Sequence, residues 1–160
     1  MGPPGVGKGT QAKIIKDELG IAHISTGELL RDEIAEKTDI GSVAKKYIDQ
    51  GKLVPDEYLF EIVRERLNKP DCTNGYILDG FPRTLNQATG LEIIMDEYEQ
   101  VLNKTISLYA DEDDLVERLV KRGKDSGRSD DTSIIIRNRQ KIYWQQTAPL
   151  LDFYNERKLL

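Results

Sequence analysis

A glycine-rich stretch near the start of the chain, GPPGVGKGT at residues 2–10, has the spacing of a phosphate-binding loop. Glycines let main-chain N–H groups turn inward around an anion without a Cβ in the way. Lys8 adds a mobile positive charge, and a helix that begins near Gly7 would direct its positive end to the same point. Because Gly9 follows the lysine, any hydroxyl group must come from Thr10, one position later than usual. The stretch predicts that residues 5–10 hold phosphate groups.

Composition narrows the class of protein. With 160 residues, the chain is long enough for one domain with a sizeable core. Its net charge of −5 argues against a general nucleic-acid or membrane-surface binder. Cys72 is the single cysteine of the sequence, which excludes an intrachain disulfide and a multi-cysteine zinc site. No apolar stretch approaches the length of a membrane span, so we expect a cytoplasmic protein with neither a nucleic-acid nor a membrane partner.

The pattern of apolar residues predicts helices that alternate with short strands. Helical spacing and capping residues predict helices at about 7–19, 26–34, 42–50, 55–67, 85–95, 111–122 and 133–154, the last one kinked near Pro149. Apolar runs predict strands at 22–25, 75–79 and 104–109, and the polar composition of 123–131 predicts a loop. This alternation is typical of an α/β fold in which helices cover a parallel sheet. Ligands of such sheets bind at the carboxyl ends of the strands.

The segment LDGFPRT at residues 78–84 places an acid at the carboxyl end of a predicted buried strand. Asp79 suits a magnesium–nucleotide site, because Mg²⁺ keeps several waters and uses few carboxylates. Gly80 allows a close approach of the main chain, and Pro82 stiffens the turn. The planar guanidinium of Arg83 suits phosphate better than an ammonium group does. The segment predicts a second set of groups around a phosphorylated ligand.

Further arginines are candidates to converge on one acidic ligand, although the net charge is negative. In STGELLR at residues 25–31, a small hydroxyl, a glycine and Arg31 can bracket another phosphate group. Arg118 and Arg122 lie four residues apart on one face of a predicted helix. Arg128 lies in the predicted loop, and Arg139 lies on the helix that follows. A loop between two arginine-bearing helices could fold over a bound polyphosphate.

Five segments together resemble the short-lid adenylate kinases of the nucleoside monophosphate kinase family. They are GPPGVGKGTQA, HISTGELLR, GKLVPDE, ILDGFPRTLNQA and the Arg-Ser-Asp-Asp stretch that follows Gly127. The resemblance covers essentially the whole chain and implies reversible transfer of a phosphoryl group from Mg·ATP to AMP, giving two ADP. It implies a P-loop NTPase-like parallel sheet with flanking helices and two small insertions. The parts would be a core of residues 1–24, 55–121 and 132–160, an AMP-binding part at 25–54 and a short lid at 122–131.

The resemblance also raises an expectation about strands. The sheet of this family has five parallel strands, with the strand before the phosphate loop at its centre. That strand and the last one are expected to be missing from this chain. An open slot in a parallel sheet would leave main-chain groups unpaired. We therefore expect the chain to be an excerpt of a longer protein.

The resemblance carries over the site residues by position. ATP would be bound by Gly5, Val6, Gly7, Lys8, Gly9, Thr10 and Arg118. AMP would be bound by Thr26, Arg31, Lys52, Leu53, Val54, Gly80, Arg83, Gln87, Arg128 and Arg139. Catalysis would depend on Lys8, Arg83, Arg122, Arg128 and Arg139, and the last three would neutralise the transferring phosphoryl group. Asp79 would order the waters of Mg²⁺, no zinc is expected, and we expect a monomer.

Several alternatives stay open. The acceptor could be another nucleoside monophosphate such as UMP or CMP, although Thr26 and the Arg83-Thr84 pair resemble the AMP enzymes. The chain could also be a catalytically inactive nucleotide-binding module. Arg118 could simply pair with Asp114, and Asp130 and Asp131 could cap the next helix or contact the ligand directly.

Overall fold

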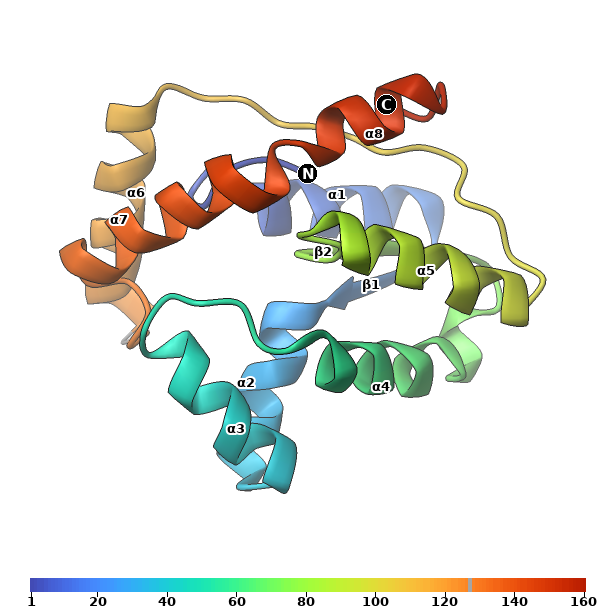
Figure 1. Cartoon of the computed structure of the whole chain (residues 1–160), viewed down its shortest axis with the longest axis horizontal. Coiled ribbons are helices and arrows are strands. Elements are labelled where there is room, and N and C mark those ends of the chain that lie inside the picture. The colour runs from blue at the N-terminus through green and yellow to red at the C-terminus, as the bar shows by residue number, and fades with distance from the viewer. Residues whose placement is uncertain (127) are drawn as a thin grey trace.

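The computed structural model describes residues 1–126 and 128–160, except for the side chains at 112 and 113. Gly127, which the sequence places within the lid, therefore lies outside the described residues. Within the described part, the chain folds into an α/β structure whose helices surround a small parallel sheet (Figure 1). None of the helices in that part combines the length and the hydropathy needed to cross a membrane.

Two short strands lie close to where the sequence predicts them and form the described sheet. β1 (Ala22–Ser25) and β2 (Tyr76–Asp79) run parallel, with Ala22 opposite Tyr76 and Ser25 opposite Asp79. α1 (Lys8–Leu19) follows the phosphate loop and packs on both strands. Because the strands are parallel and in this register, they end side by side. The residues after Ser25 and Asp79 therefore begin at the same edge of the sheet.

The helices that follow β1 form an arm beside the sheet (Figure 1). α2 (Thr26–Glu36) begins where the Ser25 hydroxyl accepts a hydrogen bond from the Glu28 main-chain N–H at 3.3 Å. α3 (Asp39–Ile48) packs along α2. It begins three residues earlier than the sequence predicts, because the Thr38 hydroxyl caps it through the Gly41 N–H at 2.9 Å. The arm leads back to the sheet through residues 49–55.

A hydrophobic core lies between the sheet and the next two helices. α4 (Asp56–Leu67) starts directly after Pro55, and α5 (Leu85–Glu97) starts after the Thr84 cap. A short 3₁₀ turn, η1 (Pro70–Cys72), precedes β2. The inner stripe predicted for α4 is confirmed, because its apolar members are buried: Leu59, Ile62, Val63 and Leu67. They pack with Ile24, Phe81, Leu91 and Ile94 in one cluster.

The strand predicted at 104–109 is wrong for the described structure, in which this segment is extended but forms no ladder. It meets the two ends of the chain through a few hydrogen bonds, one of which the Met1 amino group donates to the Ile106 carbonyl. The Leu108 N–H donates to the Met1 carbonyl at 3.0 Å, and the Thr105 N–H donates to the Leu159 carbonyl at 2.7 Å. Apolar, β-branched residues favour an extended backbone, but a strand needs a partner that continues over several residues. The described sheet therefore has two strands rather than the larger number expected.

The last third of the chain is more helical than its composition suggests. α6 (Glu112–Ser126) continues through Gly123 into the region predicted as a loop, since one glycine costs a helix only about 1 kcal/mol. α7 (Ser133–Ile142) passes through a π-helical turn, η2 (Tyr143–Thr147), to α8 (Leu150–Glu156). The predicted kink near Pro149 thus follows a turn of wider helix. Figure 1 shows α6 beside α7, with α7, η2 and α8 crossing the molecule.

Candidate active site

A cleft of about 700 Å³ opens at the carboxyl edge of the sheet. This volume lies in the usual range for ligand sites, about 300–1,000 Å³. All but one of the predicted site residues line it: Gly5, Val6, Gly7, Lys8, Gly9, Thr10, Thr26, Arg31, Lys52, Leu53, Val54, Asp79, Gly80, Arg83, Arg118, Arg122, Arg128 and Arg139. The exception is Gln87, which is fully buried behind the cleft wall. Segments that are far apart in the sequence therefore meet at one place.

The phosphate loop forms one wall of the cleft. Its glycines at 2, 5 and 7 have φ values of 134°, 88° and 95°, which residues with a Cβ rarely adopt. Lys8, the first residue of α1, turns back so that its Nζ donates to the carbonyls of Gly2 at 2.8 Å and Pro3 at 3.0 Å. Burial, and then the charge of Arg83, lower the pKa of Lys8 to about 8. The loop thus presents N–H groups, a helix start and a titratable ammonium group to the cleft.

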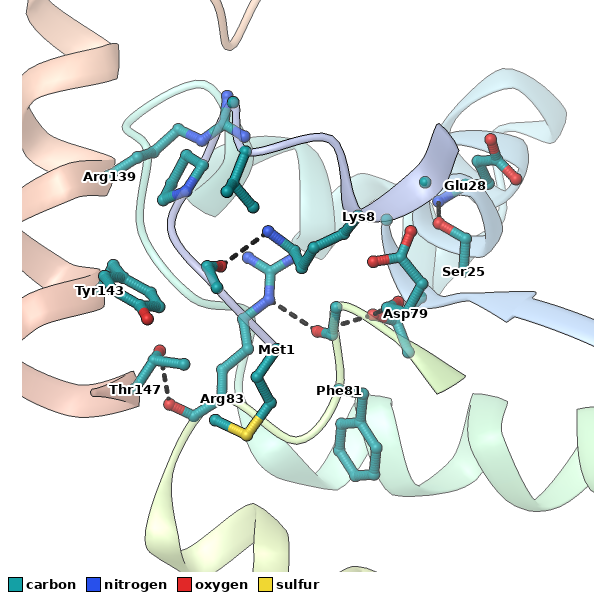
Figure 2. A pocket seen from close by; sticks show the side chains of 18 of the residues that line it. Met1, Lys8, Ser25, Glu28, Asp79, Phe81, Arg83, Arg139, Tyr143 and Thr147 are labelled. Carbon is teal, nitrogen blue, oxygen red and sulfur yellow. Dashed lines mark hydrogen bonds between the residues drawn. The ribbon is translucent and has the colours of Figure 1, made fainter. Parts of the chain in front are cut away.

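Asp79 ends β2 and faces the phosphate loop (Figure 2). A Cβ built on Gly9 would lie 3.4 Å from the Asp79 Oδ2, so the missing side chain leaves space between the loop and the carboxylate. His23 of β1 is the neighbour on the other side, with its Nε2 at 3.5 Å from Oδ2. Among the described residues, no group of three or more histidine, cysteine or acidic side chains gathers to hold a metal ion. One carboxylate beside a phosphate loop fits Mg²⁺ that arrives with its nucleotide and waters.

Arg83 is held at three points, and its outer nitrogens are directed into the cleft. Its Nε donates to the Gly80 carbonyl at 2.7 Å, and its main-chain N–H donates to Gln87 Oε1 at 2.8 Å. Its carbonyl accepts a 2.8 Å hydrogen bond from the Thr147 hydroxyl of η2. Figure 2 shows the Arg83 and Lys8 side chains directed into the same space. Burial, and then the charge of Arg139, lower the pKa of Arg83 to about 10, so it stays a cation at neutral pH.

Gly80 brings the two strand ends together at the Arg83 side of the cleft. Its φ is 81°, and a Cβ there would lie 3.0 Å from Arg83 Nη2 and 3.2 Å from Thr26 Oγ1. The buried Thr26 hydroxyl donates to the Gly80 carbonyl at 3.0 Å. Arg31 lies one turn further along α2, where burial and then the charge of Arg128 lower its pKa. These groups form the wall opposite the phosphate loop.

The arginines of the last third of the chain meet at two aspartates. Asp131 accepts hydrogen bonds from Arg122 Nε at 2.6 Å, Arg122 Nη2 at 2.8 Å and Arg139 Nη1 at 2.6 Å. Asp130 pairs with Arg128 at 3.3 Å and with Arg139 at 2.9 Å. The capping interpretation of these acids is wrong, because their carboxylates bind arginines, and the residue before α7 is Thr132, which makes no side-chain capping hydrogen bond. The acids hold three cations at the cleft.

The remaining predicted residues lie at the rim of the cleft. Arg118 lines it while its guanidinium lies 3.7 Å from Asp114, so the pairing considered from the sequence is present. The stretch Lys52–Val54 follows α3 and contributes its buried Val54. The residues just before this stretch meet the last third of the chain, because Asn138 Nδ2 donates to the Gln50 carbonyl at 2.7 Å and Ser129 donates to Asp49 at 2.9 Å.

Sequence reasoning missed several residues that support the site. Thr147 belongs to no recognisable sequence motif. It reaches Arg83 because η2 passes beside that residue in the folded chain. Asp56, the first residue of α4, accepts hydrogen bonds from Gln87 at 2.7 Å and from Asn86. The signal available for Asp56 was its place in GKLVPDE. Asp130 and Asp131 were considered from the sequence, but their pairing with the arginines was not.

Comparisons with known proteins agree with this geometry. The family model described as adenylate kinase matches residues 1–159. A curated adenylate kinase of a Cyanothece species is 46% identical over 160 residues, which cover 100% of this chain and 82% of that protein. The adenylate kinase of Rhodococcus erythropolis is 47% identical over 98% of this chain and 84% of its own length. That of Leptospira biflexa is 48% identical over 100% of this chain and 86% of its own length. The chain belongs to the adenylate kinase family.

Proposed function

We propose that the cleft binds Mg·ATP and AMP together and transfers the γ-phosphoryl group between them, reversibly, to give two ADP. An oxygen of the AMP phosphate forms the new bond to the γ-phosphorus while the bond from that phosphorus to the β–γ bridging oxygen breaks. The AMP phosphate is ionised at neutral pH, so no proton has to be removed before the transfer. Positioning and neutralisation of charge then supply the rate.

The observation that carries this proposal is the convergence of cations in a chain of net charge −5. Lys8, Arg31, Arg83, Arg122, Arg128 and Arg139 come from separate segments and line the same cleft. Like charges brought this close repel one another and are stabilised by an anionic ligand. This arrangement of cations suits the phosphate groups of two different nucleotides. One would lie against the phosphate loop and the other against Arg31 and Arg83.

Each wall of the cleft then has a role. The phosphate loop and Lys8 hold the ATP phosphates, and Arg118 stacks on the ATP adenine. Thr26, Arg31 and Arg83 serve AMP directly, and Gln87 serves it through Arg83. The main chain of Lys52–Val54 lies near the AMP base. Arg122, Arg128 and Arg139 stabilise the charge of the transferring group. The pairs with Asp130 and Asp131 support this role, because they fix these guanidinium groups before a ligand arrives.

Asp79 would hold magnesium through bound water. The ion would enter with ATP and would supply charge neutralisation at the ATP phosphates. The space left by Gly9 in front of the Asp79 Oδ2 supports this assignment. The Asp79 carboxylate would accept hydrogen bonds from the metal-bound waters and so orient them.

We further assign the AMP-binding part to residues 25–54 and a lid to 122–131, around a core formed by the remainder. Closure of these parts over two nucleotides would exclude water, which otherwise would accept the phosphoryl group. The protein would act as a monomer in the cytoplasm.

The direct test is ADP formation from Mg·ATP with AMP, UMP, CMP and GMP measured in parallel. AMP is expected to be the best acceptor by a wide margin. Equal turnover with UMP or CMP would contradict the choice of base. Nucleotide binding without turnover of any acceptor would favour an inactive binding module.

A further inference from the structure

Asp56 lies outside the set of residues that line the cleft, yet it connects the rim of the cleft at Lys52–Val54 with the helix that follows Arg83. It is the first residue of α4 and follows the stretch Lys52–Val54 after one proline. Its Oδ1 accepts a 2.7 Å hydrogen bond from Gln87 Nε2, and its Oδ2 accepts one from Asn86 Nδ2. Both partners belong to the first turn of α5. The Asp56 carboxylate thereby joins two segments. One is the stretch Lys52–Val54, which we place near the AMP base, and the other is the helix that follows Arg83.

The amide of Gln87 can take only one orientation in this setting. Its Nε2 faces a carboxylate, which accepts hydrogen bonds, and its Oε1 faces the Arg83 N–H, which donates. A flipped amide would place two acceptors together at Asp56 and two donors together at Arg83. Gln87 has 0% exposed surface, so water cannot satisfy the mismatched groups. The orientation follows from the chemistry of both neighbours.

Through Gln87, the carboxylate of Asp56 reaches Arg83. The Gln87 Oε1 fixes the Arg83 main chain at 2.8 Å, next to the turn that directs the Arg83 guanidinium into the cleft. Without Asp56, the Gln87 amide has no acceptor for its N–H and can rotate away from Arg83. The position of Lys8 depends instead on the carbonyls of Gly2 and Pro3. Loss of Asp56 should therefore affect one side of the cleft more than the other.

We propose that Asp56 is a positioning residue for the phosphate acceptor: it orients the Gln87 amide and thereby fixes Arg83 on the AMP side of the cleft. The inference rests on the proposed function, because it assigns Arg83 to AMP. A role in starting α4 is the competing explanation, since an acid in the first turn of a helix is favourable. That role predicts a change in stability alone.

The test compares steady-state kinetics of four variants with the wild type, with AMP and Mg·ATP varied in turn. Asp56→Ser and Asp56→Glu both place a residue that suits the start of a helix. The serine side chain is too short to reach Gln87, and the longer glutamate side chain moves its carboxylate oxygens away from the Gln87 amide. We expect both to raise the KM for AMP about tenfold, as for loss of one buried hydrogen bond, and to leave the KM for ATP within about twofold. Asp56→Asn keeps an acceptor for Gln87, because the exposed Asn86 can turn its own amide, and should stay within about threefold of the wild type.

Asn86→Ala is the matched control, because it removes the other hydrogen bond to the same carboxylate. It should leave both KM values unchanged. Equal changes in the two KM values, a change in melting temperature with unchanged kinetics, or an Asp56→Asn variant as impaired as Asp56→Ser would each overturn the positioning role.

Hydrogen exchange of the Arg83 main-chain amide gives a readout that does not depend on turnover. It should be at least about tenfold faster in Asp56→Ser and Asp56→Glu than in the wild type, with the amides of α1 unchanged. Unchanged exchange at Arg83 would refute the inference. Faster exchange in a protein whose wild type fails to convert AMP would uphold the positioning by Asp56 and contradict the proposed function.

Discussion

The carboxylate of Asp131 and the guanidinium of Arg122 form a two-point ion pair, with Oδ2 at 2.6 Å from Nε and Oδ1 at 2.8 Å from Nη2. The Asp131 side chain has 0% exposed surface. Arg139 of α7 binds the same Oδ1 at 2.6 Å, so one carboxylate joins α6 to α7 and directs two arginines to the cleft. Burial raises the pKa of Asp131, but the hydrogen bonds and charges of Arg122 and then Arg139 outweigh it, and the pKa lies below its ordinary value.

The substitution Asp131→Asn should lower both stability and activity. It leaves two arginines without their shared counter-charge, and Arg122 is only partly buried. The expected loss of about 2 kcal/mol in the free energy of unfolding at pH 7 lies between the values for exposed and buried pairs. Urea unfolding measures this loss of stability. The kcat should fall about tenfold, because the arginines lose their fixed orientation. Asp114→Asn is the control, since Asp114 is 60% exposed and pairs with Arg118 at 3.7 Å. An equal loss of stability in both variants would contradict the special role of Asp131.

The contribution of Asp131 to stability should also depend on pH. Its pKa in the folded state lies below that in the unfolded chain, which is about 3.9. The contribution is therefore complete above about pH 5 and is lost as the pH falls through the folded-state pKa. The difference in free energy of unfolding between the wild type and Asp131→Asn should be constant from pH 7 to 5 and shrink below pH 4. A difference that persists unchanged at pH 2 would show that the charge of Asp131 contributes nothing.

The parts of the site that the sequence predicted are those whose local geometry is determined by residues close together in the chain. The phosphate loop, the capped start of α2 and the turn from Asp79 to Arg83 each depend on glycines and polar residues within a few positions. Such local geometry leaves a pattern in the sequence. The assembly of these segments at one cleft followed from the parallel order of β1 and β2.

The parts that the sequence did not predict depend on distant partners. Whether Asp131 caps a helix or binds an arginine is decided by the approach of α6 to α7, which no local pattern specifies. The stretch 104–109 has the composition of a strand, but strand formation depends on a continuous neighbouring backbone. The contacts of the buried Gln87 amide with Arg83 and Asp56 likewise join segments that no local pattern connects.

Arg83 and Thr147 provide a test of how tightly the acceptor side must be held. Arg83→Ala should lower the rate of phosphoryl transfer by about two orders of magnitude or more with the fold retained, because a cation at the reacting phosphate is lost. Thr147→Val keeps the shape of the buried side chain but removes the 2.8 Å hydrogen bond to the Arg83 carbonyl. It should lower kcat/KM for AMP about threefold to tenfold and stability by about 1 kcal/mol. Stopped-flow or coupled assays and thermal unfolding measure these changes. Near-normal kinetics of Arg83→Ala would refute its assigned role.

The pKa of Lys8 predicts that binding of ATP is linked to proton uptake. Burial and the charge of Arg83 lower this pKa to about 8, so about half of the free protein lacks the Lys8 proton at pH 8. The ATP phosphates favour the ammonium form and should raise the pKa again. Binding at pH 8 should therefore take up as much as about half a proton, and the affinity for ATP should fall as the pH rises above 8.

Isothermal titration calorimetry at pH 8 in two buffers of different ionisation enthalpy measures this uptake. Lys8→Arg is the matched variant, because a guanidinium keeps its charge throughout this range. It should bind ATP without the uptake that Lys8 causes, even where its affinity is lower. The same proton uptake in the wild type and in Lys8→Arg would assign the linkage to another group, and the cation that meets the ATP phosphates would then not be a titrating lysine.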